Sequence, residues 1–303
     1  MISYNPRSLL SVLVSFPRSA IFKTLLVEMI IAGAYAAFIV YIEQDVGRIS
    51  VPLGPQILSL LGIILGLLLV FRTNTAYDRW WEGRRSWGTL VNVSRALARQ
   101  LAAQLPLDDS RTGRRHHWAI RLRDFPFALA THLRTPPERL RSHEPNRILA
   151  EMAVMLDEDV RHGRLASEAR IALTPLLTTY DDVCGICERI RNTPIPLSYS
   201  SYIKQFNLLY ALLVPFALAE EYGYGTVIAQ VFIFFATSGI DLLAGEIEEP
   251  FGTEVNDLPL EGLSQKIAKD VTDLLEPDTL TAQLTTAEVA QADRDVALGK
   301  AAR

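Results

Sequence analysis

The chain has 303 residues, of which 49% are hydrophobic and 21% are charged, close to the composition of an ordinary soluble protein. Its formal net charge of −4 argues against non-specific nucleic-acid binding. Only two cysteines are present, Cys184 and Cys187, which excludes a disulfide framework. The average composition hides the arrangement, because the apolar residues fall into four long blocks.

The four apolar blocks predict four membrane-spanning helices, at about residues 21–42, 52–71, 203–220 and 224–243. Each block is close to the ~20 residues that a helix needs to cross a hydrocarbon core of ~30 Å. Buried core helices of a soluble protein are the alternative, which the length of the blocks and the lack of polar positions in the second block disfavour. The segment 8–16 is expected to be an interfacial helix.

Basic residues beside the blocks predict the orientation of the chain in the membrane. Arg7, Arg18 and Lys23 precede the first block, and Arg72 and Arg79 follow the second. Because positively charged flanks stay in the cytoplasm, we expect both termini and the long middle of the chain to be cytoplasmic. Together with the four apolar blocks, this pattern predicts an integral membrane protein.

The middle of the chain is predicted to be helical. Apolar residues recur three and four apart after Trp87 and at about 115–134, 146–160 and 166–191. The prolines of 192–196 predict an extended connector. The fold class is therefore an all-α membrane protein, with a helical cytoplasmic region at about 72–200 and 244–275. The polar tail 276–303 is expected to be partly disordered.

The second block continues into charge without a break, as "GIILGLLLVFRTNTAYDRWWEGRRSWG" at 62–88. Ile63, Leu67 and Phe71 are four residues apart and share one stripe of a helix. Gly62 and Gly66 lie on the edge beside them, where small residues let neighbouring helices approach closely in lipid. From these residues alone, a stripe that faces lipid or a bundle core is the simpler interpretation.

Three separated stretches resemble the bestrophin family, and its bacterial members in particular. They are "FRTNTAYDRWWEGRRSWG" at 71–88, "NTPIPLSYS" at 192–200 and "EIEEPFGTEVNDLPL" at 246–260, and the resemblance covers about residues 5–275. The signature residues within them are Arg72, Asn74, Tyr77, Arg79, Trp80, Glu82, Arg84, Trp87, Pro250, Phe251, Gly252, Asn256 and Asp257.

The resemblance implies a homopentameric ion channel in which each subunit contributes four transmembrane helices around a central pore. It places Ile63, Leu67 and Phe71 in the apolar pore neck. A second, cytoplasmic exit constriction of the family falls near Glu168, for which a solvent-facing helix glutamate is the simpler interpretation. The similarity to bacterial members implies a location in a bacterial plasma (inner) membrane. The implied partners are further copies of the chain, membrane lipid and small monovalent ions, with no cofactor. Chloride or other anions and sodium-type cations both remain open at this point.

The acidic segment after the fourth block offers oxygen ligands of the kind that calcium prefers. These acids are Glu246, Glu248, Glu249, Glu254 and Asp257. Animal members of the family bind calcium here with a run of consecutive acids, which Val255 and Asn256 interrupt in this chain. We therefore expect no metal site, and expect the acids to pair with Arg72, Arg79 and Arg84 of a neighbouring helix.

Two other classes of protein compete with a channel. One is a membrane-anchored oligomeric scaffold or sensor whose cytoplasmic helices bind a partner. The other is a redox enzyme that uses the Cys184–Cys187 pair, which is disfavoured because no βαβ pattern surrounds that spacing. The adjacent His116 and His117 point to different sides of a helix and do not suggest a metal site. We expect a protein that is not an enzyme.

Overall fold

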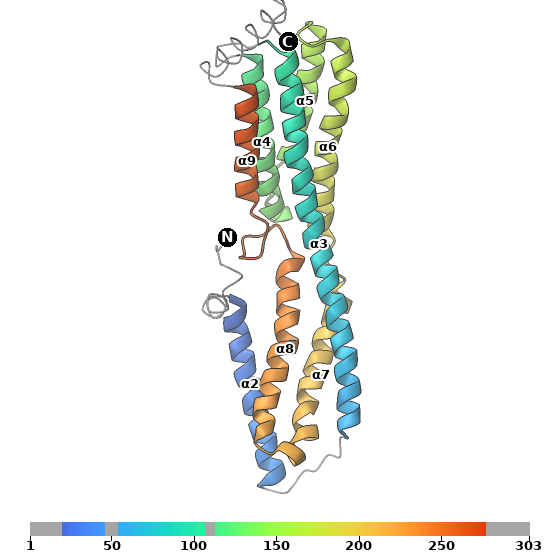
Figure 1. Ribbon diagram of the computed structural model, residues 1–303, viewed down its shortest axis with the longest axis vertical. Coiled ribbons are helices and arrows are strands. Elements are labelled where there is room, and N and C mark those ends of the chain that lie inside the picture. Colours follow the sequence, from blue (N-terminus) through green and yellow to red (C-terminus); the bar gives the residue numbers. More distant parts are fainter. Residues whose placement is uncertain (1–19, 46–53, 107–112, 277–303) are drawn as a thin grey trace, which may run out of the picture. The chain divides into compact units, whose positions relative to one another are not determined.

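The computed structural model describes residues 20–45, 54–106 and 113–276, and every regular element within these ranges is a helix (Figure 1). The segment 8–16 and the tail after residue 276, for which the sequence predicts an interfacial helix and disorder, lie outside the described residues. The chain divides into two compact units. The first is Met1–Glu82 with Asn192–Leu258, and the second is Gly83–Arg191 with Pro259–Arg303.

The first unit contains α2 (Ala20–Gln44), the beginning of α3 (Pro55–Gln104), α7 (Leu197–Tyr222) and α8 (Gly225–Glu248). Helix α2 packs against both α7 and α8, and α7 packs against α8 (Figure 1). Large apolar side chains nevertheless remain exposed, among them Ile30 on α2 and Ile228 and Phe232 on α8. Extensive apolar exposure of this kind is typical of helices whose surroundings are lipid or other subunits rather than water.

Four helices in the described part of the chain are long and apolar enough to cross a membrane. They are Phe22–Gln44, Gln56–Gln104, Leu197–Tyr222 and Gly225–Glu248. The apolar blocks predicted from the sequence fall on these four helices. The expectation that the second block continues as one helix into charged sequence is confirmed, since α3 runs unbroken through 50 residues.

A glycine turn joins α7 to α8. Gly223 ends α7 with a φ of +54°, a backbone conformation that residues with a Cβ rarely adopt. A Cβ at this position would also lie 3.0 Å from the side-chain nitrogen of Gln44. That same Gln44 nitrogen donates to the carbonyl oxygen of Ala219 at 3.0 Å, so the end of α2 is tied to the end of α7. Glycine is therefore required here for conformation and for space.

The second unit is a helical bundle built from the remainder of α3, α4 (Arg114–Arg134), α5 (Glu144–Arg161), α6 (Ser167–Asn192) and α9 (Leu260–Leu275), with the short η2 (Pro137–Arg139). Its core includes the fully buried Trp118 and Tyr180. Their polar atoms are satisfied: Trp118 Nε1 donates to Asp159 Oδ2 and the Tyr180 hydroxyl donates to Ser94 Oγ, each at 2.8 Å. The helices predicted at about 115–134, 146–160 and 166–191 are confirmed within two residues at each end.

Candidate functional site

The stripe predicted as the pore neck is exposed on α3 in the single chain. Ile63, Leu67 and Phe71 expose 70%, 56% and 54% of their surface. At 3.6 residues per turn, positions four apart drift by only about 40° around a helix, so the three side chains share one face. Leu60, one turn before the stripe, and Val70, within it, are exposed on the same face. A row of large apolar side chains that its own chain leaves uncovered requires lipid or another copy of the chain beside it.

The opposite face of α3 is packed within the chain. Leu65 and Leu69 form a buried cluster with Ile203 of α7, to which Tyr199 and Phe206 add partly buried contacts. Leu65 and Leu69 are displaced from the stripe by roughly half a turn. Helix α7 therefore fixes how α3 is rotated, and this rotation leaves the stripe facing away from α7.

The two glycines on the edge of α3 have different surroundings. A Cβ on Gly62 would lie 2.9 Å from the hydroxyl oxygen of Tyr210, so this glycine allows α7 to approach α3 closely. Around Gly66, by contrast, no atom of another described side chain lies within 4 Å of the place that a Cβ would take. Gly62 thus has a packing role inside the chain, whereas a role for Gly66 in contacts between helices stays a prediction.

An ion-pair network begins one residue after the stripe. Arg72 is buried, and its guanidinium contacts Glu248 Oε2 at 2.8 Å and Asp241 Oδ1 at 3.4 Å. The other oxygen of Glu248 accepts from the backbone N–H of Ile195 at 2.9 Å. The predicted pairing of the acidic segment with arginines of α3 is therefore confirmed for Arg72 and Glu248.

Two further signature residues, Arg79 and Trp80, also anchor α3. Arg79 Nε donates to the carbonyl oxygen of Glu248 at 3.1 Å, and Trp80 Nε1 donates to that of Asn256 at 3.0 Å. The rings of Tyr77, Trp80 and Trp81 stack along the helix with centroids 6.2 to 6.5 Å apart. These contacts hold the segment that follows α8 against α3 within the first unit.

The acidic segment itself folds into a compact turn. Asp257 Oδ2 accepts from the backbone N–H of Glu254 at 2.6 Å, and the side-chain nitrogen of Asn256 donates to Glu246 Oε2 at 2.9 Å. A Cβ on Gly252 would lie 2.5 Å from Asp257 Oδ2, so only glycine fits beside this carboxylate. The signature residues Gly252, Asn256 and Asp257 therefore build the turn.

The turn borders a polar cavity of about 550 Å³ whose lining includes Arg72, Lys204, Glu246, Glu249 and Glu254. Burial raises the pKa of Glu254 above its usual range, and the neighbouring carboxylates of Glu246 and Glu249 raise it further. Two basic and several acidic side chains therefore share this cavity. Oxygen ligands are present, but the Asp257 and Glu248 carboxylates already accept hydrogen bonds from the protein.

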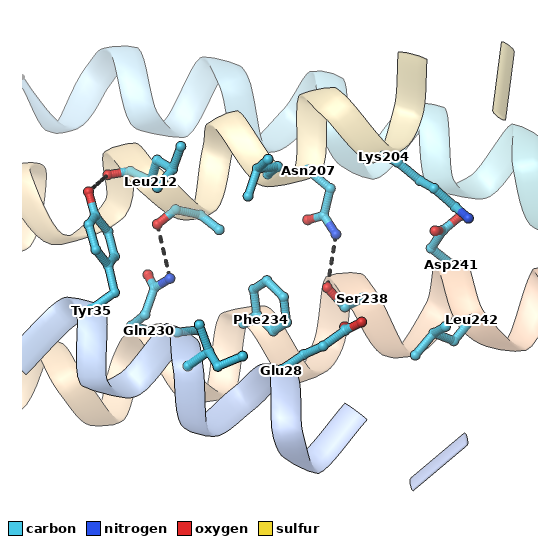
Figure 2. A pocket seen from close by; sticks show the side chains of 14 residues that line it. Glu28, Tyr35, Lys204, Asn207, Leu212, Gln230, Phe234, Ser238, Asp241 and Leu242 are labelled. Carbon is cyan, nitrogen blue, oxygen red and sulfur yellow. Dashed lines mark hydrogen bonds between the residues drawn. The ribbon is translucent and has the colours of Figure 1, made fainter. Parts of the chain in front are cut away.

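A second cavity, of about 480 Å³, lies among α2, α7 and α8 (Figure 2). Asn207 donates to Ser238 Oγ and Gln230 donates to the carbonyl oxygen of Ala211, each at 3.0 Å. Their side-chain oxygens, Asn207 Oδ1 and Gln230 Oε1, are buried and have no hydrogen-bond partner in the described part of the chain. The cavity thus combines largely apolar walls with these two acceptor oxygens and with the charged side chains of Glu28, Lys204 and Asp241.

The remaining predicted site residues have varied surroundings. Asn74 is exposed on α3, and Pro250 and Phe251 are buried at the start of the acidic turn. In the second unit, Trp87 is fully buried in the core and Arg84 lies near Gly88 on the same helix. Glu82 has contacts within the protein. Glu168 is exposed in the first turn of α6, and its place at a pore exit stays a prediction.

The cysteine pair is buried in α6 and forms no disulfide. Burial raises the pKa of the Cys184 thiol to about 12, with Glu188 and Asp181 contributing to the increase. A thiol with this pKa is protonated at neutral pH and is a poor nucleophile. This environment is unfavourable for the redox reading of the two cysteines.

The structure brings together one group that the sequence did not point to, namely His132, His143 and Glu188 of the second unit. The two histidines are eleven positions apart and lie on different elements, so their spacing matches no familiar metal-binding pattern. The sequence gives only a weak indication of this group: two of the five histidines of the chain lie close to the junction between α4 and α5.

The fold, with its four exposed apolar helices, defines an all-helical membrane protein. Residues 1–273 match the family described as "Bacterial/Fungal Bestrophin protein". A Synechocystis protein named "Voltage-dependent anion channel-forming protein" is 31% identical over 295 residues, covering 90% of this chain and 94% of that protein. A protein of the same name from Nostoc is 36% identical over 247 residues, covering 75% and 80%.

Solved structures show the same relationship. A bacterial bestrophin homologue from Klebsiella pneumoniae superimposes with a TM-score of 0.75 and 29% identity, covering 82% of this chain and 98% of that one. The chain belongs to the bestrophin family. The resemblance identified from the three sequence stretches is thereby confirmed.

Proposed function

We propose that the protein is an ion channel, a homopentamer whose neck is lined by Ile63, Leu67 and Phe71 of α3. The observation that carries the proposal is the exposure of this apolar stripe on the face of α3 that points away from α7. Five copies of the stripe around one axis would form three stacked apolar rings. A constriction of this kind gates by excluding water, so that ions meet a desolvation barrier.

The charges beside the stripe support a neck without fixed charge. Arg72 follows Phe71 directly, but it lies on the buried side of α3 and is paired with Asp241 and Glu248. A cation that is buried and paired in this way contributes little field at the opposite face of its helix. The apolar rings would therefore set the height of the barrier, and the sign of the conducted ion would be chosen elsewhere along the pore.

For the conducted ion we propose chloride and similar small anions, because the relatives from Synechocystis and Nostoc are named as anion channel-forming proteins. Sodium-type cations are the alternative. A ring of five exposed Glu168 side chains at the cytoplasmic exit would favour cations, because carboxylate rings attract them. We further propose that the four apolar helices cross a bacterial inner membrane with both termini in the cytoplasm.

The test is a measurement on the purified protein. Its mass in detergent is expected to be that of five chains, and reconstitution into planar bilayers is expected to give currents that protein-free bilayers lack. Under a potassium chloride gradient, the reversal potential is expected to lie near the chloride equilibrium potential. A reversal potential near that of the cation would replace the anion assignment, and an oligomer without currents would favour a membrane scaffold or sensor.

A further inference from the structure

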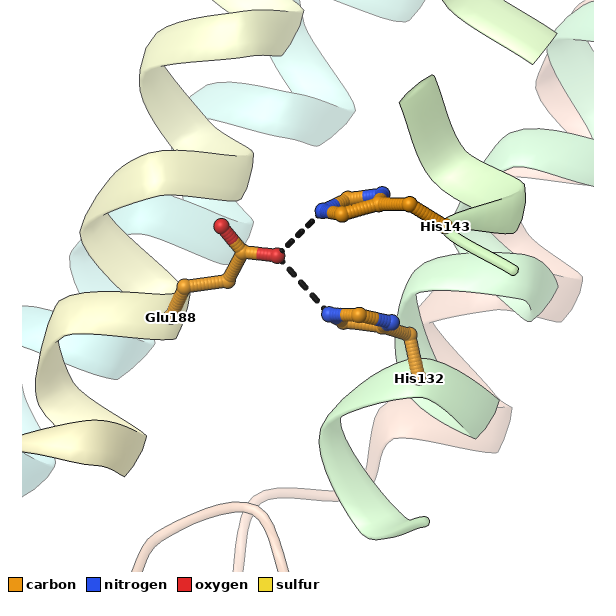
Figure 3. A group of neighbouring side chains, drawn as sticks. All are labelled: His132, His143 and Glu188. Atoms are coloured by element: carbon orange, nitrogen blue, oxygen red, sulfur yellow. Dashed lines mark hydrogen bonds and ion pairs between the residues drawn. The ribbon is translucent and has the colours of Figure 1, made fainter. Parts of the chain in front are cut away.

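Two histidines and a glutamate from three elements of the second unit converge on one point (Figure 3). His132 belongs to the last turn of α4, His143 is the residue that precedes α5, and Glu188 lies near the end of α6. His132 Nε2 lies 2.7 Å from Glu188 Oε1, and His143 Nε2 lies 2.6 Å from the same oxygen. Both imidazole rings therefore lie within hydrogen-bond distance of the same carboxylate oxygen.

The two imidazole rings present their Nε2 atoms side by side. Their centroids are 4.4 Å apart and their planes differ by 30°. One ligand atom from each of the three residues lies within 4.8 Å of the other two, which is the spacing of donors around a single metal ion. His132 is buried, whereas His143 and Glu188 are only partly covered, so an ion could enter from the side of these two residues.

We propose that His132, His143 and Glu188 form a binding site for a divalent transition metal of the zinc class. Two imidazole nitrogens and one carboxylate oxygen suit zinc, which commonly takes three protein ligands and leaves its fourth position to water. Imidazole is not a ligand that calcium or magnesium prefers, so the donor set discriminates against the abundant hard cations.

Only a small movement is needed to admit the metal. Ligands about 2.0–2.1 Å from a tetrahedral zinc ion lie about 3.3 Å from one another. The two nitrogen–oxygen distances of 2.7 and 2.6 Å must therefore each grow by roughly 0.6 Å. Rotation of the terminal torsion of the flexible Glu188 side chain can supply this change without moving α6.

Neighbouring groups hold the ligands in place. Arg191 donates to the carbonyl oxygen of His132 at 2.9 Å and also to that of Thr135, which fixes the last turn of α4 against α6. The side chain of Cys184, one turn before Glu188, is hydrogen-bonded to the Glu188 carboxylate. Ligands whose positions are set by such outer contacts lose less freedom when a metal binds.

The outer nitrogens of the two rings limit the affinity. The backbone N–H of Asn146 donates to His143 Nδ1 at 3.3 Å, and within the described part of the chain nothing hydrogen-bonds to the buried His132 Nδ1. Metal binding at Nε2 moves each ring proton to Nδ1. For His143 this removes the acceptor that caps the backbone N–H of Asn146, and for His132 it leaves a buried Nδ1–H donor without a partner. Hydrogen-bond partners for the outer ring nitrogens strengthen metal binding about 10–100-fold, so we expect this site to bind zinc more weakly by about that factor than a site with complete outer contacts.

The site is tested by isothermal titration of the full-length, metal-free protein in detergent with zinc chloride. Titration with cobalt chloride, followed by visible absorption, reports whether nitrogen and oxygen ligands surround the ion. Glu188→Gln removes the charged ligand at constant shape. His143→Asn removes a ligand but keeps a residue that caps helix N-termini well. His162→Gln is the control, since His162 is exposed at the end of α5 and lies outside the cluster.

We expect one zinc ion per chain, and an affinity that falls at least tenfold in Glu188→Gln and in His143→Asn but not in His162→Gln. Zinc should also raise the unfolding temperature of the wild type and not that of the two ligand variants, because a ligand stabilises the state that binds it. Circular dichroism verifies that each variant is folded. Absence of zinc binding in the wild type, or equal binding in folded ligand variants, would overturn the proposal.

Discussion

The guanidinium of Arg72 and the carboxylate of Glu248 lie 2.8 Å apart, and the two side chains expose only 4% and 12% of their surface. Arg72 also contacts Asp241, whose side chain is 9% exposed. One buried cation is thus paired with the buried Asp241 and the largely covered Glu248, and it joins the α3 helix that carries the apolar stripe to α8. Arg79 reinforces the same junction through the Glu248 carbonyl oxygen.

The Arg72→Gln variant is expected to be strongly destabilised. Removing one partner of a buried ion pair leaves charge uncompensated, which costs about 3–5 kcal/mol. The measurement is thermal or denaturant unfolding of the purified protein in detergent. Arg161→Gln is the matched control, because Arg161 pairs with Asp157 on the exposed side of α5 and such pairs contribute little. Equal stability of the two variants would contradict the role given to Arg72.

The Leu67→Ala variant is expected to conduct better than the wild type. If the stripe lines the neck, the substitution shortens five side chains at one level, and the widened ring admits water more readily. Single-channel recording should show higher conductance or open probability. Leu26→Ala on α2, where Leu26 is exposed to 41%, is the control and should leave currents unchanged. Ile63→Ala and Phe71→Ala extend the test, and three variants that all behave like the control would exclude the stripe from the pore.

The two glycines of α3 are expected to respond differently to the same change. Gly62→Leu places carbon where the Tyr210 hydroxyl now lies, so it should weaken the packing of α3 on α7 and lower the unfolding temperature. A Cβ at Gly66 would have no atom of another described side chain within 4 Å, so Gly66→Leu should leave the helical content of the subunit intact. Its effect should appear in the fraction of assembled oligomer, measured by mass in detergent, if Gly66 faces a neighbouring subunit. An unchanged oligomer would remove Gly66 from the subunit interface.

Conductance is expected to be insensitive to micromolar calcium. The acid run is interrupted, and one oxygen of the Asp257 carboxylate, Oδ2, already accepts a hydrogen bond from the backbone N–H of Glu254. Bilayer recordings with calcium buffered at graded concentrations check this. A rise in open probability on adding calcium, abolished by Asp257→Ala, would show that the turn binds the ion after all.

The stability of the first unit is expected to carry a pH-dependent contribution from Glu254. Burial, followed by the charges of Glu246 and Glu249, raises the pKa of this carboxyl. The folded protein therefore holds the proton more tightly than the unfolded chain, so this contribution is present at low pH and is lost as the pH rises through the raised pKa. The Glu254→Gln variant should not lose this stability as the pH rises, when unfolding temperatures of variant and wild type are compared across mildly acidic pH.

Glu261 supplies a contrast of opposite sign. A hydrogen bond from Arg134 lowers the pKa of Glu261, so its contribution is present above the ordinary pKa of a glutamate and is lost as the pH falls through the lowered value. The difference in free energy of unfolding between the wild type and Glu261→Gln should therefore decline towards low pH. The same pH dependence of the stability difference for Glu254→Gln and Glu261→Gln would contradict at least one of the two assignments.

The sequence alone determined the helices, the apolar blocks and the family. Helical periodicity and unbroken apolar runs depend on neighbours within a few residues, so the continuity of α3 and the shared stripe of Ile63, Leu67 and Phe71 could be predicted. The three sequence stretches identified the family because each resembles a family motif over consecutive residues, which can be recognised without knowledge of the fold. The sequence also predicted that the acidic segment after α8 pairs with α3, because that segment is rich in acids and the end of the apolar stretch of α3 is followed by arginines.

Tertiary structure decided which of those residues meet. Arg72 finds Glu248 across 176 positions of sequence, and no local pattern singles out that acid from Glu246 or Glu249. The distinction between Gly62 and Gly66 depends on where Tyr210 of α7 lies, although the two glycines look equivalent along the helix. The convergence of His132, His143 and Glu188 requires three elements to be packed first. Side-chain contacts between distant segments follow from packing in three dimensions, which local hydropathy does not encode.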